Sequence, residues 1–309
     1  MKFYNTDADY LEHLQQLLGD SLPELYNVGV SEANQRANTD LRLSESISEG
    51  VWRNSTVFAN VGNKLPQPIR TQWSGSDNPD AYAAHFNDPE SRKLLDRWGW
   101  TDQNVVYEIN SDGWRSRDCR EFDIDEPSLI VLGCSFTFGT GLNLEQTWGA
   151  KLAQRMGLEL VNLGVPGHSL DLSTAWLMLN QHRITNPRAV VICETPPARI
   201  SWLAAVKHAR TDTFTYPLFT LATGHDRYSP SQIHAHNWLI DNIKINSAVS
   251  YFKNRKLVEY WANSKNIPLV HFNALGVDYQ RRARDLAHFG DDWHDAVADG
   301  VATCLTKNS

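Results

Sequence analysis

The chain of 309 residues has few cysteines, no long apolar segment and no run of basic residues. The four cysteines (Cys119, Cys134, Cys193 and Cys304) form no C-x-x-C pair and match no zinc or disulfide framework, so we expect them to be reduced. No stretch approaches the roughly 18 consecutive apolar residues that a spanning helix needs. The first residues also lack the apolar core of a secretory signal. These absences favour a cytoplasmic protein.

The charge balance excludes two further classes. The formal net charge is −7 and the sequence pI is about 5.9. A nucleic-acid binder needs a clustered basic face, and so does a protein that binds anionic membranes. We therefore expect neither nucleic acid nor a membrane as partner, and composition leaves the oligomeric state open.

The chain divides into two parts by pattern. Residues 1–104 are predicted to form an N-terminal extension, with an amphipathic helix at 6–18 and irregular structure over 20–105, where Asn, Ser, Asp, Gly and Pro are frequent. Residues 105–309 are predicted to form an α/β domain. Eleven tryptophans are many for this length, and they fit either a Trp-rich core or a binding surface.

Short apolar runs alternate with helical patterns after residue 105. Such runs, bounded by turn signals, predict buried strands at 128–133, 158–163, 189–193 and 268–272. The patterns between and after them predict helices at 145–156, 170–183, 240–264 and 291–305. This alternation is typical of a parallel sheet covered on both faces, whose ligands bind beyond the carboxyl ends of the strands.

Ser135 follows the first of these strands, within Gly133-Cys134-Ser135-Phe136-Thr137-Phe138-Gly139. A serine placed there exposes its hydroxyl at the ligand-binding edge, near backbone N–H groups that could stabilise an oxyanion. A serine in an ordinary tight turn fits the same pattern. The segment is neither G-x-S-x-G nor a P-loop, and Gly139-Thr140-Gly141 is a weak dinucleotide signal because Leu144 replaces the third glycine.

Two further segments carry candidate site residues. Asn162-Leu163-Gly164 ends the second strand, and the Gly164 N–H could point into the site or belong to a plain strand-to-helix turn. Near the C-terminus, Asp285 precedes His288 by three residues, a spacing that lets a carboxylate orient an imidazole base. Asp291 and His294 repeat that spacing, which makes His294 the rival base.

Taken in order, these segments resemble the SGNH/GDSL hydrolase family. The first resembles the family's Gly-Asp-Ser block, the second its Asn-x-Gly block, and Asp285 to Gly290 its Asp-x-x-His block. The resemblance covers about residues 105–305 and implies a three-layer α/β/α, flavodoxin-like parallel sheet with an irregular N-terminal extension. It implies Ser135 as nucleophile and His288 with Asp285 as base and orienting acid. Ser135 and Gly164 would donate N–H groups to the oxyanion.

Two positions depart from the family pattern. Cys134 stands where the family has Asp, and Thr195 stands where the third block has an Asn that donates to the oxyanion. A Thr hydroxyl can donate one hydrogen bond but is shorter, and losing an oxyanion donor costs roughly 100- to 1,000-fold in rate. The segment Glu194 to Arg199 resembles a variant found in phage members, so association with a virion is also an expectation.

The resemblance implies a serine esterase or deacetylase that acts on an O-acyl ester without a cofactor or metal. The tryptophan content favours a carbohydrate ester as substrate, with a groove lined by Trp73, Trp98, Trp100 and Trp114, although these could equally be core residues. The alternative is a weakly active or inactive protein that keeps the fold for binding or structure, for example in a phage particle. A weaker third hypothesis is a metal-dependent hydrolase that uses His234 and His236.

Overall fold

A five-stranded sheet forms the centre of the computed structural model, with strand order β1-β11-β6-β4-β5. The structure describes residues 3–4, 68–117, 125–195, 200–203, 206–207, 214–215, 218–221, 243–274 and 279–307. Most of the helix predicted at 6–18 and most of the N-terminal extension therefore lie outside the described residues.

Four of the five strands are parallel and confirm the predicted sheet. They are β4 (Ser128–Leu132), β5 (Glu159–Asn162), β6 (Pro187–Glu194) and β11 (Leu269–Asn273). The fifth, β1 (Phe3–Tyr4), pairs antiparallel with β11 at the edge and was not anticipated. The chain passes from β4 to β5 on one side and then crosses to β6 on the other side of β4. The strand order therefore reverses at β4. Such a switch point is where open α/β sheets bind ligands.

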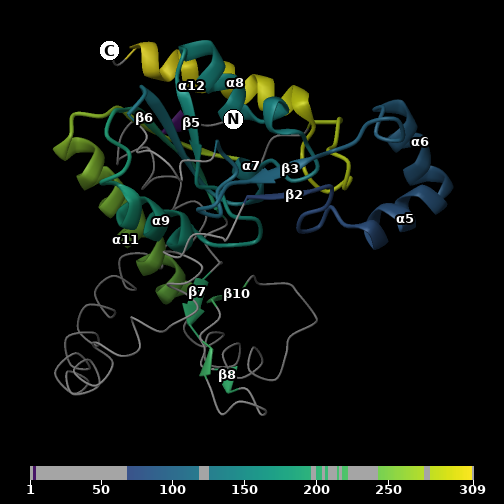
Figure 1. Ribbon diagram of the computed structural model, residues 1–309, viewed down its shortest axis with the longest axis horizontal. Helices are drawn as coiled ribbons and strands as arrows, with labels where there is room; N and C mark the ends of the chain where they lie inside the picture. The colour runs from purple at the N-terminus through teal and green to yellow at the C-terminus, as the bar shows by residue number, and fades with distance from the viewer. Residues whose placement is uncertain are drawn as a thin grey trace.

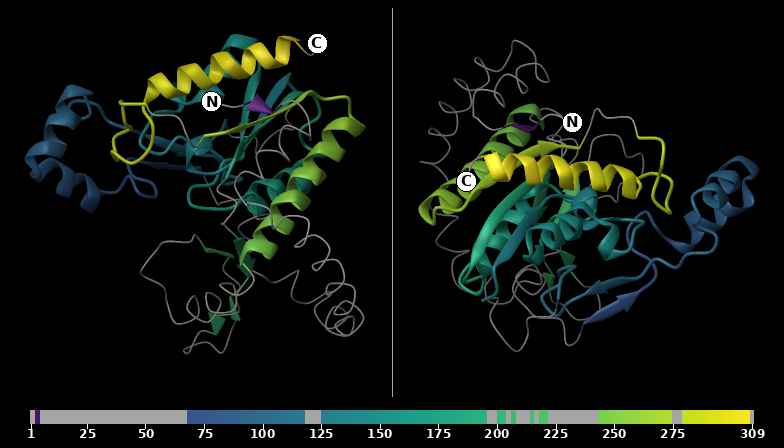
Figure 2. Two further views of the ribbon diagram at one scale, coloured as in Figure 1. Left: turned by 180° about the vertical axis from the view of Figure 1, so that it is seen from behind. Right: turned by 90° about the horizontal axis from the view of Figure 1, so that it is seen from above.

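Helices cover both faces of the sheet (Figures 1 and 2). On one face, α8 (Trp148–Met156) and α12 (Asp291–Lys307) pack on alternate residues of β4, β6 and β11. On the other, α9 (Leu170–Asn180) and α11 (Ile243–Ser264) pack on the intervening residues. All five residues of β4 are buried, which explains why its sequence is a continuous apolar run rather than an alternating one.

Local signals account for where these helices begin and end. Thr147 caps α8 by accepting the Ala150 N–H, and Gly157 ends it in the left-handed conformation that glycine adopts without strain. The predicted start at 145 is instead a short 3-10 helix, η2 (Leu144–Gln146). Ser169 caps α9, since its side chain accepts the Asp171 N–H.

The described part of the N-terminal extension is more regular than predicted. Helices α5 (Pro79–Asn87) and α6 (Pro89–Arg97) occupy much of residues 68–104, at one end of the molecule (Figure 1). Each begins with an Asn or Asp cap followed by proline, since Asn78 accepts from Ala81 N–H and Asp88 accepts from Ser91 N–H. The prediction of irregular structure is therefore wrong for residues 79–97, because Asn78 and Asp88, residue types common in loops, act as helix caps.

Residues on both sides of position 104 pack together. Strand β2 (Ile69–Thr71) pairs antiparallel with β3 (Tyr107–Ile109). A third apolar cluster joins the two parts and comprises Leu95, Trp100, Val105, Tyr107, Phe138, Leu142 and Ala283. The division at 104/105 stays a prediction, but residues 68–104 are packed against the α/β sheet region rather than separated from it.

In the described chain, four short strands between β6 and α11 form two separate antiparallel pairs. Strand β7 (Ile200–Leu203) pairs with β10 (Leu218–Leu221), and β8 (Val206–Lys207) pairs with β9 (Phe214–Thr215), both antiparallel. A search of the described helices for one with the length and apolar character to cross a membrane finds none. Cys134, Cys193 and Cys304 are free thiols, and Cys119 lies outside the described residues.

Candidate active site

Ser135 stands at the carboxyl end of the central strand β4, as the first residue of a single helical turn, α7 (Ser135–Phe138). The turn packs closely on the neighbouring strand, because a Cβ at Gly133 would come within 2.7 Å of the Cys193 carbonyl oxygen. Only glycine fits there. Ser135 is only 5% exposed, and in the described part of the chain its backbone N–H has no acceptor.

Asp285 and His288 come from a tight loop before α12. The loop is closed by hydrogen bonds from Ala283 N–H to the His288 carbonyl (2.9 Å) and from Gly290 N–H to the Arg281 carbonyl (2.9 Å). Asp285 Oδ1 accepts the N–H groups of Ala287 (3.1 Å) and His288 (3.0 Å). The carboxylate therefore shapes the loop that carries the imidazole.

The structure brings Ser135, His288 and Asp285 into one hydrogen-bonded chain. The Ser135 Oγ lies 2.7 Å from Nε2 of His288, and the His288 Nδ1 lies 2.6 Å from Oδ2 of Asp285. Residues 153 positions apart thus meet at hydrogen-bonding distance. An imidazole held in this way can accept the serine proton at Nε2 while Nδ1–H donates to the carboxylate.

Two opposing effects act on the Asp285 carboxyl. Burial raises its pKa, whereas hydrogen bonds from His288 and Ser76, together with the charge of His288, lower it. The lowering effects prevail, so the pKa of Asp285 lies below its ordinary value. Asp285 is consequently ionised at neutral pH, the state needed to orient an imidazole.

Aromatic side chains surround the imidazole on one side. The Phe136 ring meets His288 edge-on at 5.2 Å between centroids. It also packs against Phe289 at 5.5 Å and against Trp293 at 5.9 Å. These contacts limit the rotation of His288, whose side chain is 15% exposed.

The three predicted oxyanion donors differ in their surroundings. The Ser135 N–H is available, as described above. Gly164 packs against α7, but its N–H donates to Oδ1 of Asn162 at 2.9 Å, so a ligand would have to displace that bond. Thr195 is buried directly after β6, the strand beside β4, and no described hydrogen bond joins it to Ser135. Of the two backbone donors, only the Ser135 N–H is therefore free among the described contacts.

The other residues singled out from the sequence, His294 and four tryptophans, take no part in the hydrogen-bonded chain of Ser135, His288 and Asp285. His294, the rival base, is buried, and its Nδ1 accepts the Trp148 N–H at 2.9 Å, on the side of the sheet that α8 and α12 cover. Trp100 and Trp114 are each 1% exposed, so these two belong to the core and line no groove. Trp73 and Trp98 are half-buried.

No group of three or more His, Cys, Asp or Glu side chains that could hold a metal ion occurs among the described residues. His234 and His236, the basis of the metal-dependent hypothesis, lie outside the described residues.

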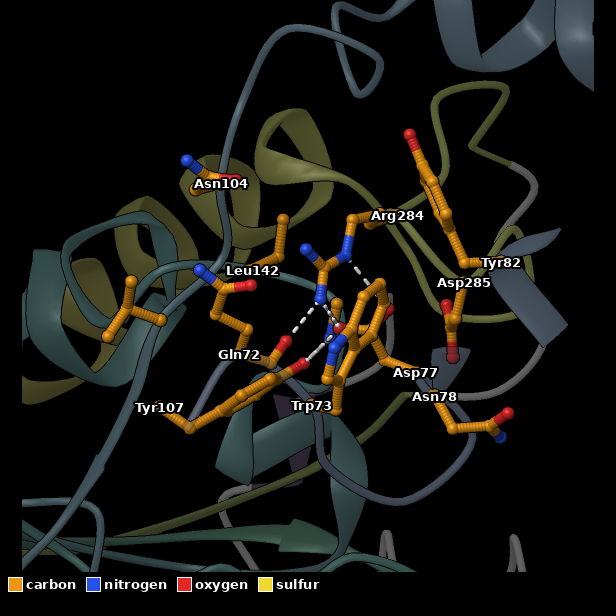
Figure 3. Close-up of polar contacts among 12 residues, drawn as sticks. Gln72, Trp73, Asp77, Asn78, Tyr82, Asn104, Tyr107, Leu142, Arg284 and Asp285 are labelled. Atoms are coloured by element: carbon orange, nitrogen blue, oxygen red, sulfur yellow. Dashed lines mark hydrogen bonds and ion pairs between the residues drawn. The ribbon is translucent and has the colours of Figure 1, made fainter. Parts of the chain in front are cut away.

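Sequence reasoning missed the residues that support the Asp–His loop. Ser76 Oγ donates to Asp285 Oδ2 at 2.7 Å. Beside it, Asp77 accepts from Arg284 at 2.9 Å and 2.7 Å (Figure 3). More than 200 positions separate these partners, and the Ser-Gly-Ser-Asp-Asn-Pro composition signalled only a turn.

Arg115, which the sequence did not single out, braces the loop after α7. Its guanidinium donates to the carbonyls of Val106 (3.2 Å), Phe138 (2.8 Å), Gly139 (2.7 Å) and Leu142 (2.6 Å). Burial lowers the pKa of Arg115 to about 10, which still leaves it charged at neutral pH. A buried cation thus fixes the chain that follows Ser135.

No protein-family model and no curated protein matches the sequence. Among solved structures, one that matches is a Desulfitobacterium hafniense DCB-2 protein assigned to the G-D-S-L family of lipolytic proteins. The match has 16% identity and a TM-score of 0.30, and it covers 57% of this chain and 98% of the other.

Proposed function

We propose that this protein is a serine hydrolase that cleaves carboxylic esters through an acyl-enzyme on Ser135. The observation that carries the proposal is the hydrogen-bonded chain from Ser135 Oγ to His288 to Asp285, with distances of 2.7 Å and 2.6 Å. Its position at the carboxyl end of β4, at the switch point of the sheet, also supports a ligand-binding site.

The proposed reaction has two half-steps. Ser135 Oγ attacks the acyl carbonyl carbon while its proton passes to Nε2 of His288. His288 then returns that proton to the departing alcohol oxygen as the ester bond breaks. Water repeats the sequence on the acyl-enzyme, releasing the acid and restoring Ser135. Asp285 remains a carboxylate throughout and stabilises the imidazolium that forms in each half-step.

The oxyanion would be stabilised chiefly by the Ser135 N–H, which has no described acceptor. We propose that Gly164 joins it by exchanging its bond to Asn162 for one to the substrate oxygen. The Thr195 hydroxyl is the third proposed donor. Each such donor contributes about 3–4 kcal/mol of transition-state stabilisation.

The finer fold assignment is part of the same proposal. We assign residues 105–309 to the SGNH/GDSL hydrolase fold, a flavodoxin-like three-layer arrangement. The support is the parallel strand order β5-β4-β6-β11, together with a Gly-x-Ser, an Asn-x-Gly and an Asp-x-x-His segment in that order along the chain.

For the substrate we propose an O-acyl ester, with an acylated carbohydrate as the alcohol to test first. The support for a carbohydrate is reduced to Trp73 and Trp98, because Trp100 and Trp114 are core residues. Failure to release acetate from acetylated sugars under conditions in which p-nitrophenyl acetate is hydrolysed would argue against this alcohol, and preference for a long acyl chain would favour a lipid or thioester substrate.

The test is hydrolysis of p-nitrophenyl acetate and butyrate by the wild-type protein and by Ser135→Ala. Ser264→Ala is the matched control, since Ser264 makes its hydrogen bond to the Trp261 carbonyl at the far end of α11. We expect turnover by the wild type and the control and none by Ser135→Ala. Equal rates in all three proteins would contradict the proposed function.

A second candidate function is that of a binding or structural protein that keeps the fold without efficient chemistry, for example in a phage particle. The engagement of the Gly164 N–H by Asn162 and the replacement of the usual Asn by Thr195 favour it. Fluorophosphonate labelling distinguishes the two, because covalent modification of Ser135 requires a nucleophilic serine. Labelling of the wild type, absent in Ser135→Ala, would reject the second candidate.

A further inference from the structure

Ser76 reaches the acidic end of the Ser135–His288–Asp285 chain from the other end of the sequence. Its hydroxyl donates to Oδ2 of Asp285 at 2.7 Å. This is the oxygen that lies 2.6 Å from Nδ1 of His288. One carboxylate oxygen therefore serves both donors, while the other accepts the two backbone N–H groups of the loop. The Asp285 side chain has no exposed surface.

The turn that presents Ser76 is held by its own hydrogen bonds. Ser74 and Asp77 exchange backbone bonds of 2.8 Å and 3.2 Å, and Gly75 between them has a φ of +64°, which glycine adopts without strain. Asn78 follows as the cap of α5. Ser76 is thus placed by a closed turn that leads directly into a helix.

Asp77 fastens this turn to the Asp–His loop (Figure 3). Its buried carboxylate binds the Arg284 guanidinium through both oxygens, at 2.9 Å and 2.7 Å. Such a fork-to-fork pair fixes orientation as well as distance. Arg284 directly precedes Asp285, so the pair sets the spacing between the Ser76 turn and the carboxylate that Ser76 binds.

Tyr107 and Gly141 extend the same network to the loop after α7. The Tyr107 hydroxyl donates to Asp77 at 2.6 Å and accepts the Gly141 N–H at 2.7 Å. The Arg284 N–H donates to the Gly141 carbonyl at 3.1 Å. The turn, the loop after the serine and the Asp–His loop are therefore joined around one buried ion pair.

We propose that Ser76 is a positioning residue of the active site, a fourth member that orients Asp285 and keeps it ionised so that His288 is held ready for Ser135. The inference rests on the proposed function, since it assigns Ser76 a role in that reaction. It also gives residues 74–78 a function within the site rather than in a separate module.

The electrostatic consequence follows from the contacts of Asp285. Burial raises the pKa of this carboxyl, and donors from His288 and Ser76 are what keep it low. Among the described residues, the charged group in contact with it is His288, and the neighbouring Arg284–Asp77 pair carries charges that offset each other. Removing the Ser76 hydroxyl takes away a donor that no other described group replaces, so the pKa of Asp285 rises.

The kinetic experiment compares wild type, Ser76→Ala, Ser76→Thr and the control Ser264→Ala with p-nitrophenyl acetate over a range of pH. For Ser76→Ala we expect kcat to fall about tenfold, with little change in KM. A loss of this size is typical when a hydrogen-bond partner that orients an active-site side chain is removed. The acidic limb of the rate profile should move to higher pH, because a carboxylate with one donor fewer stabilises protonated His288, the form that cannot accept the Ser135 proton. Ser76→Thr, which keeps the hydroxyl, should restore both values.

A purely structural role would give a different pattern. It would lower the melting temperature and the rate at every pH, without moving the acidic limb. That result would overturn the proposal, as would a Ser76→Ala protein with the kcat and pH profile of the wild type.

A second measurement does not depend on turnover. The His288 Nδ1 proton, shared with Asp285 at 2.6 Å, should give a far-downfield proton NMR signal, identified by its loss in His288→Gln. We expect this signal to move or broaden in Ser76→Ala and to persist in Ser76→Thr and Ser264→Ala. An unchanged signal in Ser76→Ala would overturn the positioning role even if the wild type hydrolyses no ester, whereas a changed signal in an inactive protein would reject only the proposed function.

Discussion

The imidazole of His294 accepts the backbone N–H of Trp148 at 2.9 Å, so the first turn of α12 is bonded to the first residue of α8. Both helices cover the same face of the sheet. The bond requires an unprotonated Nδ1. Burial, followed by the charges of Lys151, His288 and Arg115, holds the pKa of His294 well below its ordinary value of 6.5.

This bond predicts a specific loss of stability in acid. In the unfolded chain His294 takes up a proton as the pH falls below about 6.5, while the folded protein resists protonation. The free energy of unfolding should then decrease by about 1.4 kcal/mol per pH unit from this residue alone. His294→Asn keeps an acceptor at the Nδ1 position without titrating, so its denaturation midpoint should fall less steeply with pH. His182→Asn, on the exposed surface, is the control, and equal slopes for His294→Asn and wild type would contradict the prediction.

The buried carboxyl of Glu194 should make the stability of the protein depend on pH in the opposite direction. Burial raises the pKa of this carboxyl to about 7, against hydrogen bonding from Tyr251 and the charge of Arg255, which lower it. Between about pH 4.5 and 7 the unfolded chain loses the proton while the folded protein keeps it, so stability decreases as pH rises. Glu194→Gln, which resembles the protonated form, should raise the free energy of unfolding by up to about 3 kcal/mol at pH 8 and change it little at pH 4.5. Urea denaturation at the two pH values measures this, and an equal effect at both would reject the assigned cause.

Asp285→Asn tests the orientation of the base. An amide in place of the carboxylate presents an N–H or a neutral oxygen to Nδ1, which favours the wrong tautomer and removes the charge that stabilises the imidazolium. We expect kcat for p-nitrophenyl acetate to fall on the order of 10⁴-fold with little change in KM. Combined with Ser135→Ala, it should cause almost no further loss, because the residues act as one unit. Additive losses in the double variant would contradict a shared mechanism.

Arg115→Lys tests the brace behind the nucleophile. A lysine ammonium cannot reach the carbonyls of Val106, Phe138, Gly139 and Leu142 together, so buried acceptors lose their donors. We expect the free energy of unfolding to fall by about 3 kcal/mol. Arg155→Lys is the matched control on α8, where half-exposed pairs with Asp295 and Asp299 should make the change worth less than about 1 kcal/mol. Similar losses in the two variants, measured by chemical denaturation, would argue against a special role for Arg115.

The sheet was predictable because its signal is local. Each parallel strand is a short run of apolar residues bounded by turn signals, and burial on both faces leaves no room for polar alternation. The two-residue strand β1 has too few residues to carry such a pattern. Helices α5 and α6 were missed for another reason, since Asn78-Pro79 and Asp88-Pro89 signal a helix start as well as a loop.

The site was predictable where a motif and a strand end coincide. Ser135 follows a recognisable strand, and Asp285 with His288 has the spacing of an acid–base pair, so both could be named before their contact was known. The partnership of Ser76 with Asp285 could not, because it depends on how a turn and a loop 209 positions apart pack together. The occupation of the Gly164 N–H by Asn162 likewise depends on side-chain placement that no spacing reveals.

The pairing of β2 with β3 and the apolar cluster around Trp100 and Tyr107 have a consequence for how such a chain can change over time. A deletion of residues 68–104 would uncover the apolar side chains of Phe138 and Leu142 beside α7. The same deletion would remove the Ser76 hydroxyl that donates to Asp285. Exchange of this segment between related chains would succeed only if the Asp–His loop were exchanged with it. We therefore expect the two segments to change together in evolution, although almost the whole sheet lies between them in the sequence.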